Sequence, residues 1–440
     1  MKGSHKMAFK LHGVHVPHRK HTQDMSAVRM PSPKTVTIPM VMHIGAPATV
    51  VVKAGDTVKR GTLIATPSAF VSSPIYSSVS GVVKSIDDFL LSNGQTTPAV
   101  VIESDGEMAV DESVKPPVVD SKESLIEAVK NSGIVGLGGA GFPTFVKFNT
   151  DKTINELVVN GAECEPYITS DSVTMVDSKD DIGYALEVLI KYLNIENVII
   201  GIESNKPQAI EAMKEIAGRF SNVTVKTLPP VYPQGGEKVL VYHTTGKVIP
   251  MGGLPIDVGC VVCNSSTIAA IGKYLKTGMP LIEKCVTVDG QAVNNPQNII
   301  VPIGTSLIDV FEFCGGFKAE PAKVLYGGPM MGIAVPELNA PIIKNTNAVL
   351  AFSEKEAKLP DTTACIKCGA CANHCPFGID PRAIAKAYSD NDLEKTKELG
   401  VTLCMECGCC SFVCPANRPL VQTNRLVKVE LKNQKPKEAK

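Results

Sequence analysis

The sequence predicts a multidomain protein that combines α/β and α+β architecture, and three observations support this prediction. The chain has 440 residues, enough for two to four domains. Its hydrophobic pattern changes from short β segments to helical spacing near residue 120. Nine of its 14 cysteines lie between Cys365 and Cys414, which marks the C-terminal part as a separate module.

Charge and hydropathy exclude several classes of protein. The 44 Lys and Arg residues balance the 44 Asp and Glu residues, and no long basic run is present to neutralise the phosphates of a nucleic acid. No uninterrupted apolar stretch is long enough to span a membrane, and the first thirty residues lack the apolar core of a secretory signal. We therefore expect a cytoplasmic protein with no transmembrane segment of its own, whose cysteines serve metal or redox chemistry.

The chain starts with an arm and a small all-β domain. Four short β segments, TVTIPM, ATVVVKAGDTV, LIATP and SGVVKSI, are separated by Gly and Pro within residues 34–118. The preceding arm, residues 1–33, has a histidine every third position, which invites a metal site. Gly13 and Pro17 break the helix that would align these histidines, so an arm that binds no metal is favoured. The histidines are His12, His15, His18 and His21.

An α/β unit follows a polar linker. Ser121 is placed to cap its first helix. Apolar runs at 156–160, 197–202 and 222–228 are separated by helical stretches, a pattern typical of a Rossmann-like layered core. After it, the stretch from Cys285 to Gly316 is β-rich, with one short helical run near 307–313, and predicts a small β-plus-α module.

These observations divide the chain into six segments, of which the last is expected to be a disordered tail. The predicted boundaries are 1–33, 34–118, 119–280, 281–356, 357–425 and 426–440.

Two cysteine runs in the C-terminal module share one spacing. In both, cysteines at i, i+3, i+6 and i+10 are followed by Pro, and the second run repeats the first after 39 residues. This is the spacing of bacterial ferredoxins, in which three cysteines ligate one 4Fe–4S cluster and the fourth ligates the other. The first cluster is therefore assigned to Cys365, Cys368, Cys371 and Cys414, and the second to Cys404, Cys407, Cys410 and Cys375.

Zinc is the alternative, because thiolate quartets also bind Zn²⁺. The duplicated spacing with Pro after each fourth cysteine favours iron–sulfur clusters. Cys409 is an extra thiol that could compete as a ligand or pack as a spare buried cysteine. Two clusters indicate a path for single electrons, so another part of the chain must supply those electrons.

A glycine-rich loop is the candidate for that part. Gly136, Gly138 and Gly141 fit the pattern G-x-G-x-x-G, whose backbone can approach a phosphate or a flat ring closely. The loop follows a predicted helix rather than a strand, so a plain dinucleotide-binding site is not supported. Taken alone, the loop could also be a flexible turn.

The loop GLGGAGFPTFVK (136–147) and the segment VVNGAECEPYITSD (158–171) resemble the flavin-binding loops of the NADH-oxidising subunit of respiratory complex I. They resemble even more closely the C-subunit family of the Rnf electron-transport complex. The resemblance covers about residues 9–425. It implies an N-terminal barrel-sandwich domain, a Rossmann-like flavin domain, a β-grasp module of the soluble-ligand-binding (SLBB) type and a two-cluster ferredoxin domain.

The resemblance also implies which residues hold a non-covalent FMN and its partner NADH. Glu163 and Glu165 would lie beside the isoalloxazine and the nicotinamide ribose, and Phe142 would stack near the nicotinamide or adenine. These three are the candidate catalytic residues. Complex I has an acidic residue where this chain has Ala162, so one contact is lost. The candidate cofactor-binding residues are Gly136, Gly138, Gly139, Gly141, Lys147, Asn160, Gly236, Glu237, Asn264 and Thr267.

Several of these residues have a simpler interpretation. Glu163 and Glu165 could be solvated turn carboxylates, and Gly236 could belong to an ordinary turn. Asn264 could cap a helix as readily as contact a phosphate. Cys260 and its neighbour at i+3 are more typical of buried structural thiols than of a redox pair. The same packing role is expected for Cys164, Cys263, Cys285 and Cys314.

Residues 50–86 resemble a biotinyl or lipoyl carrier domain. Such a domain presents a Lys at a hairpin tip, and the span 61–83 contains no Lys. The fold is therefore expected without the swinging arm.

The working hypothesis is a subunit that exchanges a hydride between NADH and FMN and passes single electrons through two 4Fe–4S clusters. The resemblance implies work at the cytoplasmic face of a membrane complex that exchanges electrons between ferredoxin and NAD, coupled to Na⁺ or H⁺ translocation. Partner subunits would supply the membrane spans. Two alternatives remain: a soluble reductase similar to the cobalamin reductases, and an adaptor that lacks FMN and conducts only through its clusters.

Overall fold

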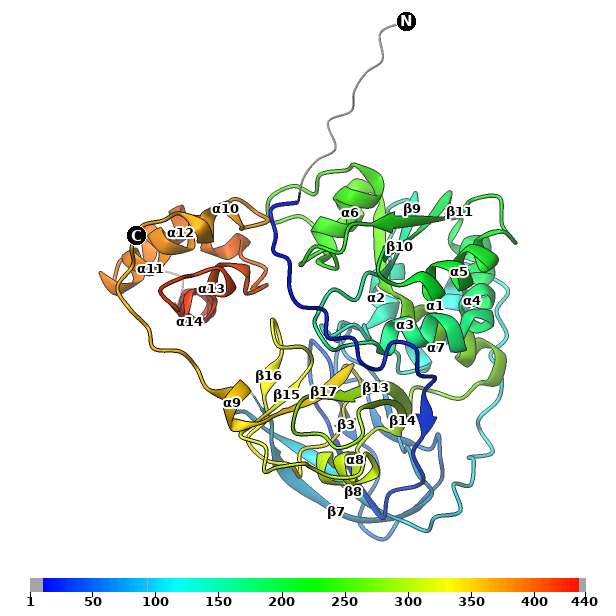
Figure 1. The fold of residues 1–440 in the computed structure, drawn as a ribbon. Helices are drawn as coiled ribbons and strands as arrows, with labels where there is room; N and C mark the ends of the chain where they lie inside the picture. The colour runs from blue at the N-terminus through cyan, green and yellow to red at the C-terminus, as the bar shows by residue number, and fades with distance from the viewer. Residues whose placement is uncertain (1–10, 93, 435–440) are drawn as a thin grey trace, which may run out of the picture.

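The structure is a computed structural model that describes residues 11–92 and 94–434. The chain forms four modules, and a long extended segment after α9 leads to the orange and red helices of the C-terminal module (Figure 1). The multidomain α/β and α+β fold class is confirmed. Within the described residues, no helix is both long and apolar enough to cross a membrane.

The N-terminal β module consists of two antiparallel sheets. One has the strand order β2-β8-β7-β4 and the other β3-β5-β6. Alternate residues of β2 point inward, so that Val36 and Ile38 are fully buried opposite Val100 and Ile102 of β8. The strands are β2 (Thr35–Pro39), β3 (Thr49–Val50), β4 (Thr57–Val58), β5 (Leu63–Thr66), β6 (Ile75–Tyr76), β7 (Gly81–Leu90) and β8 (Thr96–Ser104).

The second module is a parallel four-stranded sheet with helices on its faces, as the sequence predicted. Ser121 caps α1, its side chain accepting a hydrogen bond from the Ser124 amide. The strands are β9 (Glu156–Gly161), β10 (Asn197–Glu203), β11 (Val223–Leu228) and β12 (Cys260–Asn264). The helices are α1 (Lys122–Asn131), α2 (Thr144–Phe148), α3 (Ser170–Asp177), α4 (Lys179–Leu193), α5 (Pro207–Ala217), α6 (Glu237–Thr245), η1 (Pro255–Val258) and α7 (Ser265–Thr277).

The order of this sheet, β11-β10-β9-β12, places a topological switch between β9 and β12. From β9 the chain proceeds to one side through β10 and β11, and then returns to the other side as β12. The register pairs Asn160 with Asn264 at the carboxyl ends of the two strands. Ligands of open α/β sheets bind outside the carboxyl ends of the strands at such a switch point. The fold thus marks one edge of the sheet as the candidate site.

The third module is a mixed six-stranded sheet with the order β1-β14-β13-β17-β15-β16. Its outermost strand, β1 (Val28–Arg29), comes from the N-terminal arm and pairs in parallel with β14. The predicted helical run near residue 307 is α8. The other elements are β13 (Glu283–Asp289), β14 (Gln297–Pro302), α8 (Leu307–Phe313), β15 (Lys323–Tyr326), β16 (Ile333–Ala334) and β17 (Ala348–Phe352).

The C-terminal module is helical, and its last helix differs from the prediction. The sequence predicted a disordered tail from residue 426, but α14 continues to Asn433 and buries Val427 completely against the module. The apolar side of α14 therefore belongs to the core, while residues 435–440 lie outside the described range. The short helix α9 (Glu354–Ala357) still packs against β17 of the third module. The elements of the C-terminal module are α10 (Ala370–Asn373), α11 (Pro381–Ser389), α12 (Leu393–Glu398), η2 (Val401–Leu403), α13 (Cys409–Phe412) and α14 (Leu420–Asn433).

The described part of the N-terminal arm, from residue 11 onward, runs across the other modules and does not gather its histidines at one point. His15 is exposed. The other three lie in separate contacts: His12 with Asn373, His18 with Asn205, and His21 with Asp289.

Candidate functional site

The glycine-rich loop lies beside the carboxyl ends of β9 and β12 and is held from three directions. The Leu137 amide donates to Thr267 Oγ1 over 2.9 Å. The Leu137 carbonyl accepts from Lys284 Nζ at 2.9 Å, and the Gly139 carbonyl accepts from Asn345 Nδ2 at 2.7 Å. Residues 138–140 at the tip remain exposed. The loop is therefore fixed at its base and open at its tip, as a cradle for a ligand requires.

Gly138 cannot carry a side chain without moving its neighbour. A Cβ atom there would lie 2.9 Å from Asn264 Nδ2. Asn264 is itself fixed, because its amide oxygen accepts from the Ser266 and Thr267 amides and its Nδ2 donates to Asp171 Oδ2 over 2.6 Å. The helix-cap interpretation of Asn264 is thus confirmed, whereas its contact with a phosphate stays a prediction.

Glu163 is buried and Glu165 is half-buried, so the interpretation as solvated turn carboxylates is wrong for Glu163 and does not describe Glu165 fully. Glu163 is buried and accepts from the Asp171 amide at 2.7 Å and from the Ser172 hydroxyl. Burial raises the pKa of Glu163. Glu165 accepts from the amides of the adjacent residues 330 and 331 at 3.0 and 2.8 Å. Burial raises its pKa to about 7, although these two amides oppose the shift. Both carboxylates hold backbone amides of other segments, and their catalytic role stays a prediction.

The remaining predicted flavin residues form two small groups. Lys147 Nζ donates to the Val262 carbonyl at 2.8 Å and lies 3.2 Å from Glu237 Oε1. Asn160 Nδ2 donates to the Gly235 carbonyl at 2.9 Å. Phe142 is partly buried, and its carbonyl accepts from the Gly136 amide. The structure thus brings the predicted residues of β9, α2 and α6 to one edge of the sheet.

Residues that the sequence analysis missed supply unpaired polar atoms beside the same loop. Thr144 Oγ1, Ser265 Oγ and Asn345 Oδ1 are buried and have no hydrogen-bond partner within the described residues. Unpaired buried polar atoms are rare in folded proteins and call for a partner. Thr144 starts the helix after the glycine loop, and Ser265 starts α7 next to Asn264. A polar ligand such as FMN fits this donor and acceptor set.

The predicted cysteine quartets each line one cavity. The first cavity is bordered by Cys365, Cys368, Cys371 and Cys414. The second is bordered by Cys375, Cys404, Cys407 and Cys410. The fourth cysteine of each run thus lies with the first three of the other run. Among the described residues, no group of three or more His, Cys, Asp or Glu side chains is placed to hold a single metal ion.

The two runs also share their backbone conformation. Lys367 and Glu406 are left-handed, with φ of 57° and 62°, although neither is glycine. Gly369 and Gly408, which precede α10 and α13, follow with φ of 75° and 80°. The repeat in the sequence is therefore a repeat in the structure.

The other cysteines are buried or partly buried thiols. Burial raises the pKa of Cys260 to about 12 and that of Cys263 to about 11, so both stay protonated at neutral pH. This environment fits the packing interpretation of the pair. Cys409 borders the second cavity without belonging to the predicted quartet, and its Sγ lies 3.9 Å from the Tyr232 carbonyl.

The second cysteine cavity adjoins the flavin module directly. The Tyr232 hydroxyl donates to the Cys407 carbonyl over 2.7 Å. A Cβ atom on Gly236 would lie 2.4 Å from the methyl carbon of Met405, which follows Cys404. Asn160, at the end of β9, bonds the same loop through Gly235. One loop, residues 232–236, therefore contacts both the predicted flavin site and the second cysteine run.

A glycine cradle at the switch point of a parallel sheet, linked through the loop 232–236 to the second of two thiol-lined cavities, is typical of a flavin–iron–sulfur electron-transfer protein. Matches to family models agree with this class. They are the Nuo51 FMN-binding domain (residues 129–273), the RnfC barrel sandwich hybrid domain (8–107), the SLBB domain (285–334) and the 4Fe-4S dicluster domain (361–418). FMN and iron–sulfur clusters are thus the cofactors, and the zinc alternative is not supported.

Curated relatives match nearly the whole chain. The C subunit of the proton-translocating ferredoxin:NAD(+) oxidoreductase complex of Clostridium ljungdahlii is 43% identical over 95% of this chain and 93% of its own. The C subunit of the Na(+)-translocating complex of Acetobacterium woodii is 42% identical over 97% of both chains. The chain belongs to the family of C subunits of ion-translocating ferredoxin:NAD(+) oxidoreductase complexes. An NAD+-reducing NiFe-hydrogenase structure matches 71% of this chain and 54% of its own at 19% identity, with a TM-score of 0.47.

Proposed function

We propose that this chain is the NADH-oxidising or NAD-reducing subunit of a membrane-bound, ion-translocating ferredoxin:NAD oxidoreductase. It would exchange a hydride between NADH and FMN and pass single electrons through two 4Fe–4S clusters. The observation that carries the proposal is the loop 232–236, which contacts Asn160 on one side and the second cysteine run on the other. When bound, FMN accepts two electrons as a hydride and releases them one at a time.

The chain's own residues would bind and orient the reactants and exclude water. The open tip of the glycine loop would let the flavin approach the backbone closely, and the neighbouring unpaired hydroxyls of Thr144 and Ser265 would bind its polar groups. Phe142 would provide a stacking surface for the nicotinamide or adenine. Hydride transfer needs no acid or base, so Glu163 and Glu165 would act by fixing the loop after β9.

Contact between modules supports an order for the two clusters. The second cavity adjoins the flavin module, whereas the first is lined by the exposed cysteines Cys365 and Cys368. Electrons would then pass between the flavin and the second cluster, and between the first cluster and a partner. The relatives are named as subunits of ion-translocating complexes, so we place this partner among the other subunits, with the chain peripheral at the cytoplasmic face.

Anaerobic purification of the full chain, with FMN and iron assayed, tests this proposal against an adaptor that lacks FMN. Stopped-flow mixing with NADH should bleach the flavin band first and the cluster absorbance afterwards. A chain that holds iron and sulfide but no FMN after reconstitution, and that does not respond to NADH, would show the adaptor interpretation to be right.

Two glycine variants, compared by their FMN affinity, test where the flavin binds. Gly138→Ala would push a methyl group against the fixed Asn264 and should weaken FMN binding by about tenfold. Gly218→Ala is the matched control, because its Cβ would meet only ordinary contacts at 3.5 Å. Equal FMN affinity in both variants would place the flavin elsewhere.

A further inference from the structure

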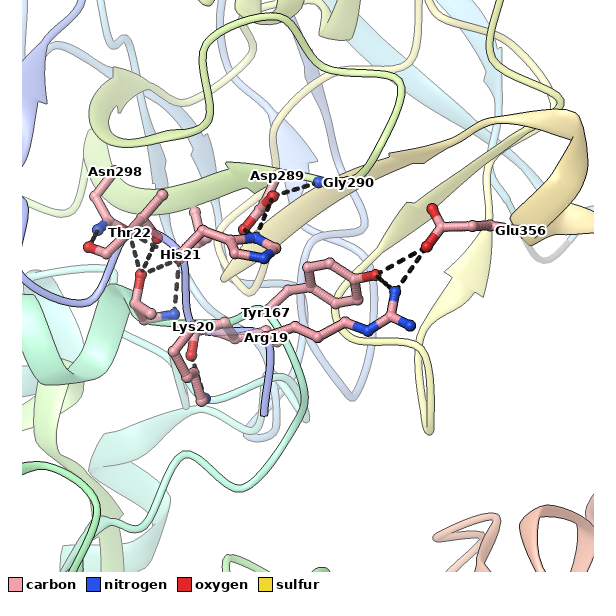
Figure 2. A network of polar contacts seen from close by, with 12 residues as sticks. Arg19, Lys20, His21, Thr22, Tyr167, Asp289, Gly290, Asn298 and Glu356 are labelled. Carbon is pink, nitrogen blue, oxygen red and sulfur yellow. Dashed lines mark hydrogen bonds and ion pairs between the residues drawn. The ribbon is translucent and has the colours of Figure 1, made fainter. Parts of the chain in front are cut away.

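The N-terminal arm lies across the segment that carries Glu163 and Glu165. Near its start, Val14 pairs with Tyr232 through hydrogen bonds of 2.8 and 3.0 Å. Near its end, β1 joins the sheet of the third module. Between these anchors, residues 19–22 face the loop 163–169, and Figure 2 shows Arg19 and His21 turned toward Glu356 and Asp289.

Lys20 is the residue of the arm that enters this loop. Its ammonium group donates to the Glu163 carbonyl at 2.8 Å, to the Glu165 carbonyl at 2.8 Å and to the Ile168 carbonyl. A lysine has three N–H donors, so all of them are used on one loop. The bonds span 143 to 148 positions of sequence. The loop is thus tied together by a residue from another module.

The loop needs such a tie because its backbone is unfavourable by itself. Glu163 and Tyr167 are left-handed, with φ of 46° and 69°, a conformation that side chains other than Gly rarely adopt. Three carbonyl dipoles converge on one point, where they would repel each other without a cation. Lys20 supplies that cation.

Contacts lead from this loop to the predicted flavin site. Glu163 accepts from the Asp171 amide, and Asp171 accepts from Asn264 and Ser266 side chains at 2.6 Å each. Asn264 in turn lies against Gly138 of the glycine loop. A shift of the loop after β9 would therefore be transmitted to the cradle.

We infer that Lys20 is a positioning residue of the flavin and NADH site, which it completes from outside the flavin module by fixing the loop 163–168. The inference rests on the proposed function, because it presumes that FMN binds beside this loop. Lys20 acts through the loop and need not touch the cofactor. The N-terminal arm is accordingly part of the site rather than a connection between modules.

The protonation of Lys20 predicts that binding to the site depends on pH. Burial lowers the pKa of Lys20 to about 8. The Glu163 and Glu203 carboxylates favour its charge, Lys206 disfavours it, and Cys164 and His18 also lie within its field. As the pH rises through about 8, the ammonium becomes a neutral amine with two donors, and one carbonyl loses its partner. Binding to the site should weaken over the same range.

The test compares two variants of Lys20 and one control variant, each made in the full chain with its clusters in place. Lys20→Met keeps the length of the side chain and removes the charge and the donors. Lys20→Arg keeps the charge, but the planar guanidinium group cannot direct three donors from one nitrogen to the three carbonyl oxygens. Lys84→Met is the matched control, since it makes the same change at an exposed lysine of β7, in the N-terminal β module. Each is stripped of FMN and titrated with FMN, following the quenching of flavin fluorescence.

Lys20→Met should raise the FMN Kd about tenfold and Lys20→Arg by less, whereas Lys84→Met should stay within about twofold of wild type. The wild-type Kd should rise as the pH passes through about 8, and Lys20→Met should lack this rise. Unchanged FMN affinity and pH profile in Lys20→Met would overturn the inference and leave the proposed function standing.

The wild type alone keeps the inference testable if Lys20→Met fails to fold. A wild-type FMN Kd that stays flat between pH 7 and about 9 would overturn the role of Lys20. A wild type that binds no FMN at any pH, and is not bleached by NADH, would instead overturn the proposed function.

Discussion

The two cysteine cavities have the same spacing and the same backbone turns, yet they lie in different surroundings. Cys365 and Cys368 of the first cavity are exposed, whereas Cys407 and Cys410 of the second are buried. Cys404 of the second accepts from Asn424 Nδ2 at 3.3 Å and from the Glu406 amide at 3.4 Å. Hydrogen bonds to sulfur and solvent exposure set cluster potentials. Duplicated motifs can thus specify two distinct redox sites once the chain packs around them.

The largest expected effect comes from removing a cysteine ligand of the second cavity. Cys407→Ser should stop electrons from reaching either cluster while NADH still bleaches the flavin, because the second cavity adjoins the flavin module. Cys365→Ser, the matched change in the first run, should leave the second cluster reducible. Stopped-flow absorbance and electron paramagnetic resonance distinguish the two. Normal reduction of the first cluster in Cys407→Ser would show that the order is wrong.

The next largest effect tests the prediction that the fourth cysteine of each run ligates the cluster held by the other run. Cys414→Ser should lose the same cluster as Cys365→Ser, although Cys414 belongs to the second run, because both line one cavity. Cys375→Ser should instead match Cys404→Ser. Each single variant should retain about half of the iron. Paramagnetic resonance spectra that group the variants by run, rather than by cavity, would contradict this pairing.

Glu165 lies between the flavin loop and residues 330 and 331, on the side of the second cavity. Its pKa is raised from 4.5 to about 7 by burial, so the folded chain holds this proton more tightly than the unfolded chain. The stabilisation is present below about pH 4.5 and is lost as the pH rises through about 7. Glu165→Gln should remove this loss, and Glu237→Gln, at a more exposed carboxylate, is the control. Denaturant unfolding of wild type and variants at pH 5 and about pH 8 checks the prediction, which parallel curves would contradict.

The smallest expected effect comes from removing one hydrogen bond to a cysteine sulfur of the second cavity. Asn424→Ala removes the bond to Cys404 Sγ and should lower the potential of the second cluster while leaving the first unchanged. Loss of the donor leaves the reduced, more negative cluster less stabilised. A redox titration followed by paramagnetic resonance measures both potentials. A shift confined to the first cluster would contradict the assignment of Cys404.

Much of the local structure could be predicted because it depends on neighbours in the chain. Ser121 caps its helix through a residue three positions away, and the strands of the flavin module follow from short apolar runs. The helical tail was missed because the prediction rested on its polar end, while Val427 is buried by packing against the C-terminal module.

The candidate site could be predicted only in part. The glycine loop and the cysteine runs are continuous motifs, so their residue types and spacing are visible in the sequence. Lys284 and Asn345 were missed, since nothing near them in sequence indicates the glycine loop that they hold. The burial of Glu163 was also missed: its partners lie only eight and nine positions away, but they contact Glu163 only once the loop between them has folded.

The sequence by itself determined the iron–sulfur clusters, because these depend on short cysteine motifs with fixed spacing, and its resemblance to a known family implied FMN and the order of the modules. Only the tertiary structure decided which cysteine cavity faces the flavin module, how the carboxylates of Glu163 and Glu165 are satisfied and where the N-terminal arm lies. These depend on contacts between residues far apart in the chain, such as Lys20 and Glu163, 143 positions apart. Hydrogen bonds between such residues form only when the modules pack, and local patterning carries no record of them.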